Sequence, residues 1–313
     1  MRALLLRPWI WAWAGAIAVW VMTTAATAGA SAGGLTQAAF TFAAFSVIVG
    51  IGQMFVITLG PGNIDLSIPA TMTLAGTVSL KFMAEQNGLI IPGLAISLGI
   101  GAGVGIANYT LIKALRIPPI IATLAMSFLI QSMAIWTNRG LRVKPPEWLA
   151  SASTGNLWGI PNVAIMAGLL TVAAWFLLER TPFGRRVTAI GQSMAAARMA
   201  GVPVDGVRLL TYVLCATLAG LGGFLLACFS GGAALNMGAE YLLASIAVVV
   251  IGGSSVAGGN SNVPGIWGAA LFLFLVVSML NTYGFGAGPR LILTGLIIIA
   301  VILAASARRT EAR

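Results

Sequence analysis

Apolar residues occur in long runs along this chain of 313 residues, and short segments between the runs hold the charges. An α-helix needs about 20 mostly apolar residues to cross the hydrocarbon core of a bilayer. Ten segments approach this length, the third and eighth being short and interrupted: approximately 8–30, 37–59, 64–80, 89–107, 118–136, 161–178, 209–230, 241–256, 263–280 and 291–307. The pattern predicts an all-α fold, a polytopic transmembrane bundle of about ten helices, some interrupted, in a single domain over residues 1–313.

The first apolar segment has two interpretations. Arg2 and Arg7 precede it and Ala-x-Ala patterns lie within Thr27–Ala32, as in a cleaved signal peptide. The run from Trp9 to Ala30 is long for a signal peptide. We therefore expect a retained helix.

Composition excludes several classes of protein. Charged residues make up 8% of the chain, against about a quarter in soluble domains, so a soluble α/β protein is excluded. The 39 glycines suit closely packed membrane helices. Histidine is absent, which excludes His-based metal sites and bases. Cys215 and Cys228 would lie about 20 Å apart on one helix, too far for a disulfide, so we expect both to be reduced.

The net charge of +10 bears on topology. The basic residues lie between apolar runs and not on one soluble face, which argues against nucleic-acid binding. Cytoplasmic loops hold the excess of Lys and Arg in membrane proteins. Placing both termini in the cytoplasm leaves only a minority of basic residues outside: Lys81, Arg139, Arg142, Lys144 and Arg290. We expect a multi-pass membrane protein with both termini in the cytoplasm.

The largest inner loop, residues 180–208, contains the signals of a short helix. Ser193 can cap the start of a helix over 194–200. Gly201 suits the left-handed position that follows a helix, and Pro203 prevents continuation. A helix of about two turns is marginal alone in water. It packs either on the chain's own bundle or in a groove of a cytoplasmic partner.

Two acidic residues stand beside predicted helix breaks. The stretch Gly60-Pro-Gly-Asn63 precedes Asp65 and cannot run as a regular helix. Irregular backbone at membrane depth is tolerated only where it is buried in protein or lines water. Asp65 either lines a solute path or caps the following helix. Glu240 lies either at the outer mouth or at a helix cap.

Neutral polar residues in the apolar segments suit a solute rich in hydroxyl groups. Residues of this kind are Gln53, Asn108, Thr123, Gln131 and Asn281. For each of them taken singly, a hydrogen bond between helices is the favoured interpretation. The candidate solute path consists of Gln53, Asn63, Asp65, Ser67, Thr123 and Asn281.

Four motifs occur in an order that resembles a known family. They are Arg180-Thr-Pro-Phe-Gly-Arg-Arg-Val-Thr-Ala-Ile-Gly191 with Ala-Ala-Arg-Met-Ala-Gly201, the run 238–259 ending Gly-Gly-Ser-Ser-Val-Ala-Gly-Gly, Asn63-Ile-Asp-Leu-Ser67, and Ile117-Pro-Pro-Ile-Ile-Ala-Thr-Leu124. Together they are similar to the signatures of ABC permeases of the ribose/xylose/galactose type, a family related to branched-chain amino acid permeases. The chain departs from the family pattern at Asn63 and at Ile68-Pro69.

The resemblance implies a transport subunit of the bacterial cytoplasmic (inner) membrane, and its partners. The short inner helix would be the coupling helix, contacting a separate ATPase subunit through Ala196, Ala197, Arg198 and Gly201. ATP and Mg would be bound by that ATPase, with no cofactor or metal on this chain. A solute-binding protein would deliver a sugar or sugar-like solute, and a second permease copy, identical or paralogous, would complete the path.

Other functions stay open as alternatives. No Gly-Lys pair occurs, so the phosphate-binding loop of an ATPase is missing and we expect no enzymatic activity. The runner-up is an ion- or proton-coupled secondary transporter, for which only Asp65 and Glu240 are core candidates. A membrane enzyme fits poorly with the absence of histidine. Branched-chain amino acids, nucleosides and autoinducer-type furanoses are alternative cargoes.

Overall fold

The computed structural model describes residues 8–27, 29, 32–138, 143–286, 288–297 and 299. Several residues used in the topology prediction lie outside the described residues: Arg2, Arg7, Arg139, Arg142, Arg308, Arg309 and Arg313.

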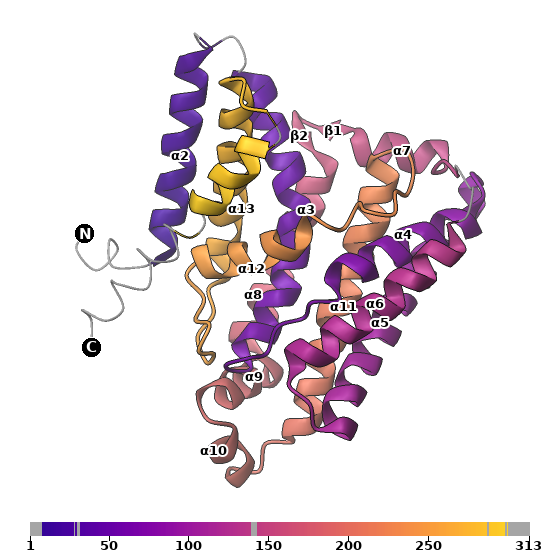
Figure 1. Cartoon of the computed structure of the whole chain (residues 1–313), viewed down its shortest axis with the longest axis vertical. Helices are drawn as coiled ribbons and strands as arrows, with labels where there is room; N and C mark the ends of the chain where they lie inside the picture. The colour runs from indigo at the N-terminus through magenta and orange to yellow at the C-terminus, as the bar shows by residue number, and fades with distance from the viewer. Residues whose placement is uncertain are drawn as a thin grey trace.

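The structure is helical throughout, with one two-stranded hairpin among the described residues (Figure 1). Seven apolar helical stretches are long enough to cross a membrane. They are α2 (Pro8–Ala26), α3 (Ala32–Thr58), α5 (Ile90–Leu115) with the preceding η1 (Asn87–Leu89), α6 (Pro119–Thr137), α8 (Asn162–Arg180), α11 (Val204–Phe229) and α13 (Val263–Thr282).

Three further predicted segments contain shorter helices. They are α4 (Ile68–Met83), α12 (Tyr241–Ile251) and Gly288–Ile297. The third and eighth segments are thus short, as expected. The predicted all-α polytopic fold is confirmed.

Two loop regions contain short elements of secondary structure. The loop after α6 contains α7 (Glu147–Thr154) and a hairpin of β1 (Asn156–Leu157) and β2 (Ile160–Pro161). The inner loop contains α9 (Pro182–Gln192) before α10 (Met194–Met199). The helix α9 was not predicted, although Pro182 at its first position and Thr181, whose hydroxyl accepts a bond from Gly184 N at 3.3 Å, are start signals. These two regions lie at opposite ends of the molecule (Figure 1).

The helix α11 forms the centre of one group of helices, packed against α3, α4 and α5. Its contact with α5 is close because glycines face the neighbouring backbone. A Cβ at Gly105 would lie 2.5 Å from the Cα of Val213, and one at Gly220 would lie 2.6 Å from the carbonyl oxygen of Ser97. Small residues allow such approach between membrane helices, as the glycine content indicated.

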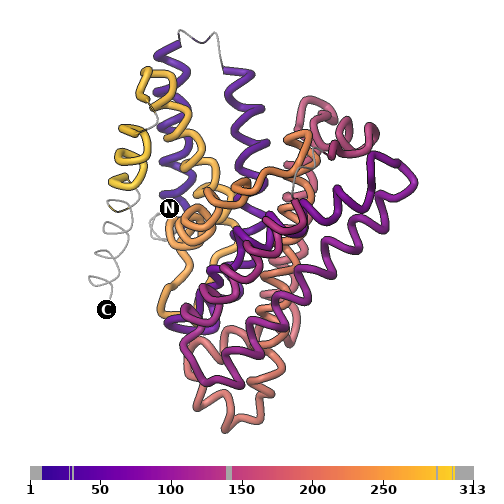
Figure 2. The backbone as a smooth tube through the Cα atoms, turned by 45° about the vertical axis from the view of Figure 1, so that its right-hand side comes forward, coloured from indigo at the N-terminus to yellow at the C-terminus, as the bar shows by residue number. Residues whose placement is uncertain are grey.

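A second group of helices brings together an early helix and a late helix of the chain. The first helix, α2, packs along α13, and Trp13 Nε1 donates to the carbonyl of Pro264 at 3.1 Å. Figure 2 shows the two as indigo and yellow coils side by side. Whether the first segment is retained or cleaved stays a prediction, but in this arrangement α2 is part of the bundle.

Candidate functional site

The main polar feature inside the bundle is the non-helical segment 59–67 between α3 and α4, called here the α3–α4 break. It runs from the lower end of α3 toward the middle of the molecule, where α4 begins (Figure 1). Pro61 and Gly62 are exposed, whereas Asn63, Asp65 and Ser67 are buried. The break therefore meets the condition for irregular backbone at membrane depth, because surrounding helices cover it.

The carboxylate of Asp65 is completely buried and is held by hydrogen-bond donors. Its Oδ1 accepts from Ser67 N at 2.8 Å and from the Ser67 hydroxyl at 2.6 Å. Asn108 Nδ2 donates to the same oxygen at 3.3 Å and to the Ser67 hydroxyl oxygen at 2.8 Å. Among the described residues no Lys or Arg forms an ion pair with Asp65. Fixed dipoles, and not a counterion, therefore compensate this group.

Asp65 also shapes the start of α4. Ser67 is the N-cap residue of α4, but its own side chain makes no capping bond. The Asp65 carboxylate instead closes a turn onto Ser67, two residues ahead. It supports the helix start without bonding the amides of the first turn, which differs from an ordinary cap.

Two buried polar atoms beside Asp65 have no hydrogen-bond partner among the described residues. Gln53 Oε1 accepts from Asp65 N at 3.3 Å, and this bond fixes the orientation of the amide and leaves Gln53 Nε2 unpaired. Asn108 donates through Nδ2, which leaves its Oδ1 unpaired. Buried polar groups normally find partners. A spare donor and a spare acceptor in one cluster match a hydroxyl group, which can accept and donate at once.

Thr123 connects the α3–α4 break to α6. Its hydroxyl oxygen lies 3.1 Å from Leu66 N, which donates to it, and 3.2 Å from the carbonyl of Ile64. Thr123 is buried near the start of α6, four residues after Pro119, with which the helix begins. The motif 117–124 thus places a threonine where it bonds the backbone on both sides of Asp65.

Asn63 faces away from Asp65, toward α11. Its Oδ1 accepts from the Tyr212 hydroxyl at 3.2 Å and from Arg208 Nη2 at 3.3 Å. Its Nδ2 donates to the carbonyl of Gly60 at 3.1 Å. Sequence reasoning missed Arg208 and Tyr212, because the partners lie 145 and 149 positions from Asn63 along the chain.

The structure brings together only part of the predicted solute path. Gln53, Asp65, Ser67 and Thr123 form one buried cluster with Asn108, and Asn63 adjoins it. Asn281 does not join them: it is exposed near the end of α13 and accepts from Arg290 Nη1 at 2.7 Å. Gln131 is also elsewhere, donating to the carbonyl of Leu235 at 2.9 Å.

Glu240 stands in a different setting from Asp65. It is exposed and occupies the N-cap position of α12, but its side chain makes no capping hydrogen bond. Of its two predicted roles the cap is not supported, and a place at the outer mouth stays a prediction.

The predicted short inner helix is present as α10, at the lower tip of Figure 1. The Ser193 hydroxyl accepts from Ala196 N at 3.2 Å, and Gly201 has a φ of +80°, as the capping signals predicted. Ala196, Arg198 and Gly201 are exposed. Ala197 is placed differently from the expectation: it is only 5% exposed and packs in the core, so it secures α10 to the chain and leaves its neighbours to face outward.

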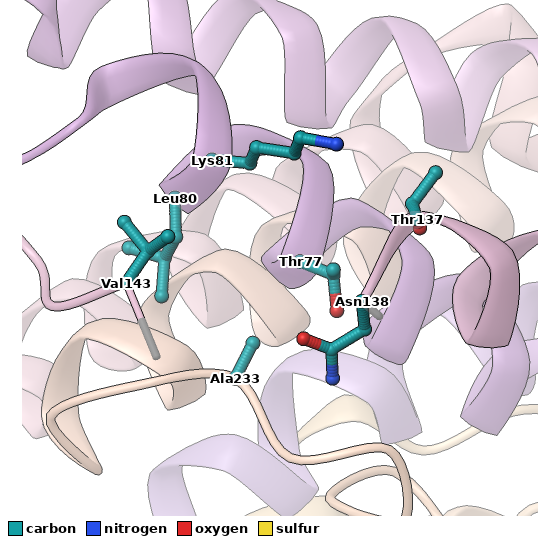
Figure 3. A pocket seen from close by; sticks show the side chains of 7 residues that line it. All are labelled: Thr77, Leu80, Lys81, Thr137, Asn138, Val143 and Ala233. Carbon is teal, nitrogen blue, oxygen red and sulfur yellow. The ribbon is translucent and has the colours of Figure 1, made fainter. Parts of the chain in front are cut away.

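Two pockets lie at opposite ends of the molecule, and neither is lined by the Asp65 cluster. One, of about 350 Å³, lies beside α9 and is lined by residues that include Glu179, Arg185, Gln192 and Asn260. The other lies between the ends of α4 and α6, where Lys81, Thr77 and Asn138 surround it (Figure 3). The side chains of the Asp65 cluster are themselves buried among the described residues.

Comparison with known proteins places this arrangement in context. Residues 35–306 match the model of a family described as branched-chain amino acid transport system/permease component. The ribose import permease protein RbsC of Bacillus subtilis is 33% identical over 83% of this chain and 81% of its own length. RbsC of Escherichia coli K12 is 29% identical over 82% and 81%. The fructose import permease protein FrcC of Rhizobium meliloti is 30% identical over 82% and 73%. No solved structure matches the chain.

Proposed function

Because the chain belongs to the family of ABC-importer permease components, and is a multi-pass inner-membrane subunit of that kind, we propose that its cargo is a sugar or sugar-like solute. The subunit itself carries the solute across the membrane, and a separate polypeptide hydrolyses ATP.

The observation that carries the sugar proposal is the buried cluster around Asp65. It offers amide and hydroxyl groups, with a spare donor at Gln53 and a spare acceptor at Asn108. The side chains of the cluster other than Asp65 are neutral, and among the described residues no Lys or Arg forms an ion pair with Asp65. A polyhydroxyl solute pairs with neutral donors and acceptors. The relatives named for ribose and fructose import are consistent with this choice.

The ATPase partner is proposed to dock on α10. This helix is short, and its exposed side presents Ala196, Arg198 and Gly201. Small residues allow a close approach, and the Arg198 guanidinium can pair with a carboxylate or with backbone carbonyls of the ATPase. ATP and Mg would be held by the ATPase alone, so this chain binds no cofactor.

The opposite end is proposed to receive the solute-binding protein. There the hairpin exposes Trp158, at 93%, and α7 exposes Trp148, at 63%. The α9–α10 end then faces the cytoplasm together with both termini, in accord with the positive-inside tendency. A second permease copy, identical or paralogous, would complete the path along the subunit interface.

Transport would proceed by opening the buried Asp65 cluster to each side in turn. Binding of ATP by the partner would move α10, and the bundle would change which end of the path is open. The alternative, an ion- or proton-coupled carrier, is favoured by one observation, the buried carboxylate of Asp65 without a counterion.

One reconstitution separates the two proposals. The chain is purified with the ATPase and binding protein from its gene neighbourhood and inserted into vesicles, and uptake of labelled ribose and fructose is measured. We expect uptake that requires ATP and the binding protein. Uptake that follows a Na⁺ or proton gradient without any ATPase would support the secondary carrier instead.

A further inference from the structure

We infer that the α3–α4 break is the element through which the α9–α10 loop acts on the solute path, and that Asn63 is the positioning residue that transmits this action. The inference rests on the proposed function. It assigns Asn63 to coupling within the protein, in place of solute contact.

The first connection runs through the start of α11. Only four residues, 200–203, separate α10 from α11, so a displacement of α10 pulls directly on the first turns of α11. Arg208 and Tyr212 lie four positions apart and therefore on the same face of that helix. Both donate to Asn63 Oδ1, at 3.3 Å and 3.2 Å. The side chain of Asn63 is thus the acceptor that joins α11 to the break.

The same part of α11 is held against α5. Asp205 accepts from the Tyr109 hydroxyl at 2.9 Å and forms an ion pair with Lys113 at 3.2 Å. The Arg208 guanidinium lies over the Tyr109 ring at 5.6 Å from its centroid. These contacts fix the direction in which Arg208 points. A movement of α11 therefore carries α5 with it and reaches Asn63 through a side chain with little freedom.

The second connection runs through the end of α9. Gly191 lies so close to the end of α3 that a Cβ there would overlap the carbonyl oxygen of Thr58 and Gly259 N. Gly259 N itself donates to the carbonyl of Thr58 at 2.9 Å. The beginning of the break is therefore held between the end of α9 and the loop that follows α12. Gly191 lies three residues before Met194, with which α10 begins.

The far end of the break carries the polar cluster. Two residues after Asn63, Asp65 closes its turn onto Ser67, and Leu66 N bonds Thr123 of α6. Because packed contacts change between discrete arrangements and do not stretch continuously, a shift at Asn63 is passed to the start of α4 and α6. The inner loop and the cluster are thus joined by one short segment that is held at both ends.

The experiment measures solute molecules transported per ATP hydrolysed in vesicles that contain the full transporter. Asn63→Ala removes the acceptor and should lower this ratio about tenfold while the ATPase stays bound, as expected for coupling free energies in allosteric proteins. Asn63→Asp keeps an acceptor for Arg208 and Tyr212 but loses the Nδ2 donor to the Gly60 carbonyl, so it should restore part of the ratio. Tyr212→Phe removes one donor and should give an intermediate loss.

A matched control removes a similar bond at the other end of the molecule. Asn162 Nδ2 donates to the carbonyl of Ala152 at 2.8 Å beside α7, so Asn162→Ala should weaken folding without changing the transport ratio. A structural role of Asn63 alone would lower the amount of folded protein but leave the ratio unchanged. An unchanged transport ratio in Asn63→Ala would overturn the inference. A ratio in Asn63→Asp that is no higher than in Asn63→Ala would also overturn it.

The proposed function can fail independently. If the wild-type chain binds no ATPase and transports without ATP, the proposed function is wrong. If the wild-type transporter is driven by ATP and Asn63→Ala retains the wild-type ratio, only the inference about Asn63 is wrong.

Discussion

The break before α4 and the break before α12 look alike in the sequence and differ in the structure. Each places an acidic residue just ahead of a short apolar helix. Asp65 is completely buried and receives three donors, from Ser67 N, the Ser67 hydroxyl and Asn108. Glu240 is exposed and makes no capping bond.

The difference teaches that an acidic residue at a helix break acquires its role from what surrounds it. Burying a carboxylate is costly unless donors compensate it, so a protein that buries Asp65 has to supply Ser67 and Asn108 as well. Glu240 remains in contact with solvent and imposes no such requirement. The break before α4 is therefore built around its acid, and the break before α12 is not.

Removing the buried acid should have the largest effect. Asp65→Ala leaves Ser67 N and the Ser67 hydroxyl without their acceptor inside the bundle, at about 1–3 kcal/mol for each buried group. We expect solute uptake to fall below detection and the temperature of unfolding in detergent to drop. Uptake at the wild-type rate by Asp65→Ala would show that the buried cluster does not matter to transport.

Reversing the exposed charge on α10 should have the next largest effect. Arg198→Glu places a negative charge where an anionic or carbonyl group of the ATPase is expected, so copurification of the ATPase should fall about tenfold. The unfolding temperature should stay unchanged, because Arg198 is exposed. Arg186→Glu, an exposed arginine of α9, is the matched control and should retain the ATPase. Equal loss in both variants would contradict a specific contact at Arg198.

Adding one methyl group where α9 contacts the break before α4 should have a moderate effect on transport. Gly191→Ala forces α9 away from Thr58, and overpacking of this kind costs about 1–3 kcal/mol. Transport should decrease more than stability, because the contact joins the inner loop to the break. Gly206→Ala is the control: apart from adjoining residues and the nearby backbone of its own helix, no atom lies within 4 Å of the added carbon. Equal transport by Gly191→Ala and Gly206→Ala would contradict a role for the contact between α9 and the break.

Neutralising the exposed acid should have the smallest effect. Glu240→Gln removes a charge that makes no capping bond, so the unfolding free energy should change by no more than about 0.5 kcal/mol. A change in the affinity of the binding protein, measured by titration, would place Glu240 at the outer mouth. A large loss of stability would mean that the two breaks are more alike than the structure indicates.

Much of the fold could be predicted because hydrophobic length is a local property. Each of the ten apolar segments contains a described helix. The capping residues Ser193 and Gly201 predicted α10 for the same reason, since caps act over a few positions. The helix α9 was not predicted although Thr181 and Pro182 signal its start, because its 11 residues are amphipathic and form no long apolar run.

The site could be predicted only in part, because its pairings are long-range. Gln53, Asp65, Ser67 and Thr123 were identified as polar residues in apolar segments, and they do meet. Nothing local to Asn63 indicates Arg208 or Tyr212, and nothing local to Asn281 shows that it stands apart from the cluster. Ala197 differs from Ala196 only in the side of a two-turn helix that it occupies, and the packing of that helix decides which one is buried.

The most direct test measures ATP hydrolysis and solute uptake together, in vesicles that contain this chain, its ATPase and the binding protein. The account predicts that the loaded binding protein stimulates hydrolysis, that uptake stops when ATP is withdrawn, and that both depend on the inner loop. Uptake that continues without ATP or ATPase, driven by an ion gradient, would contradict it.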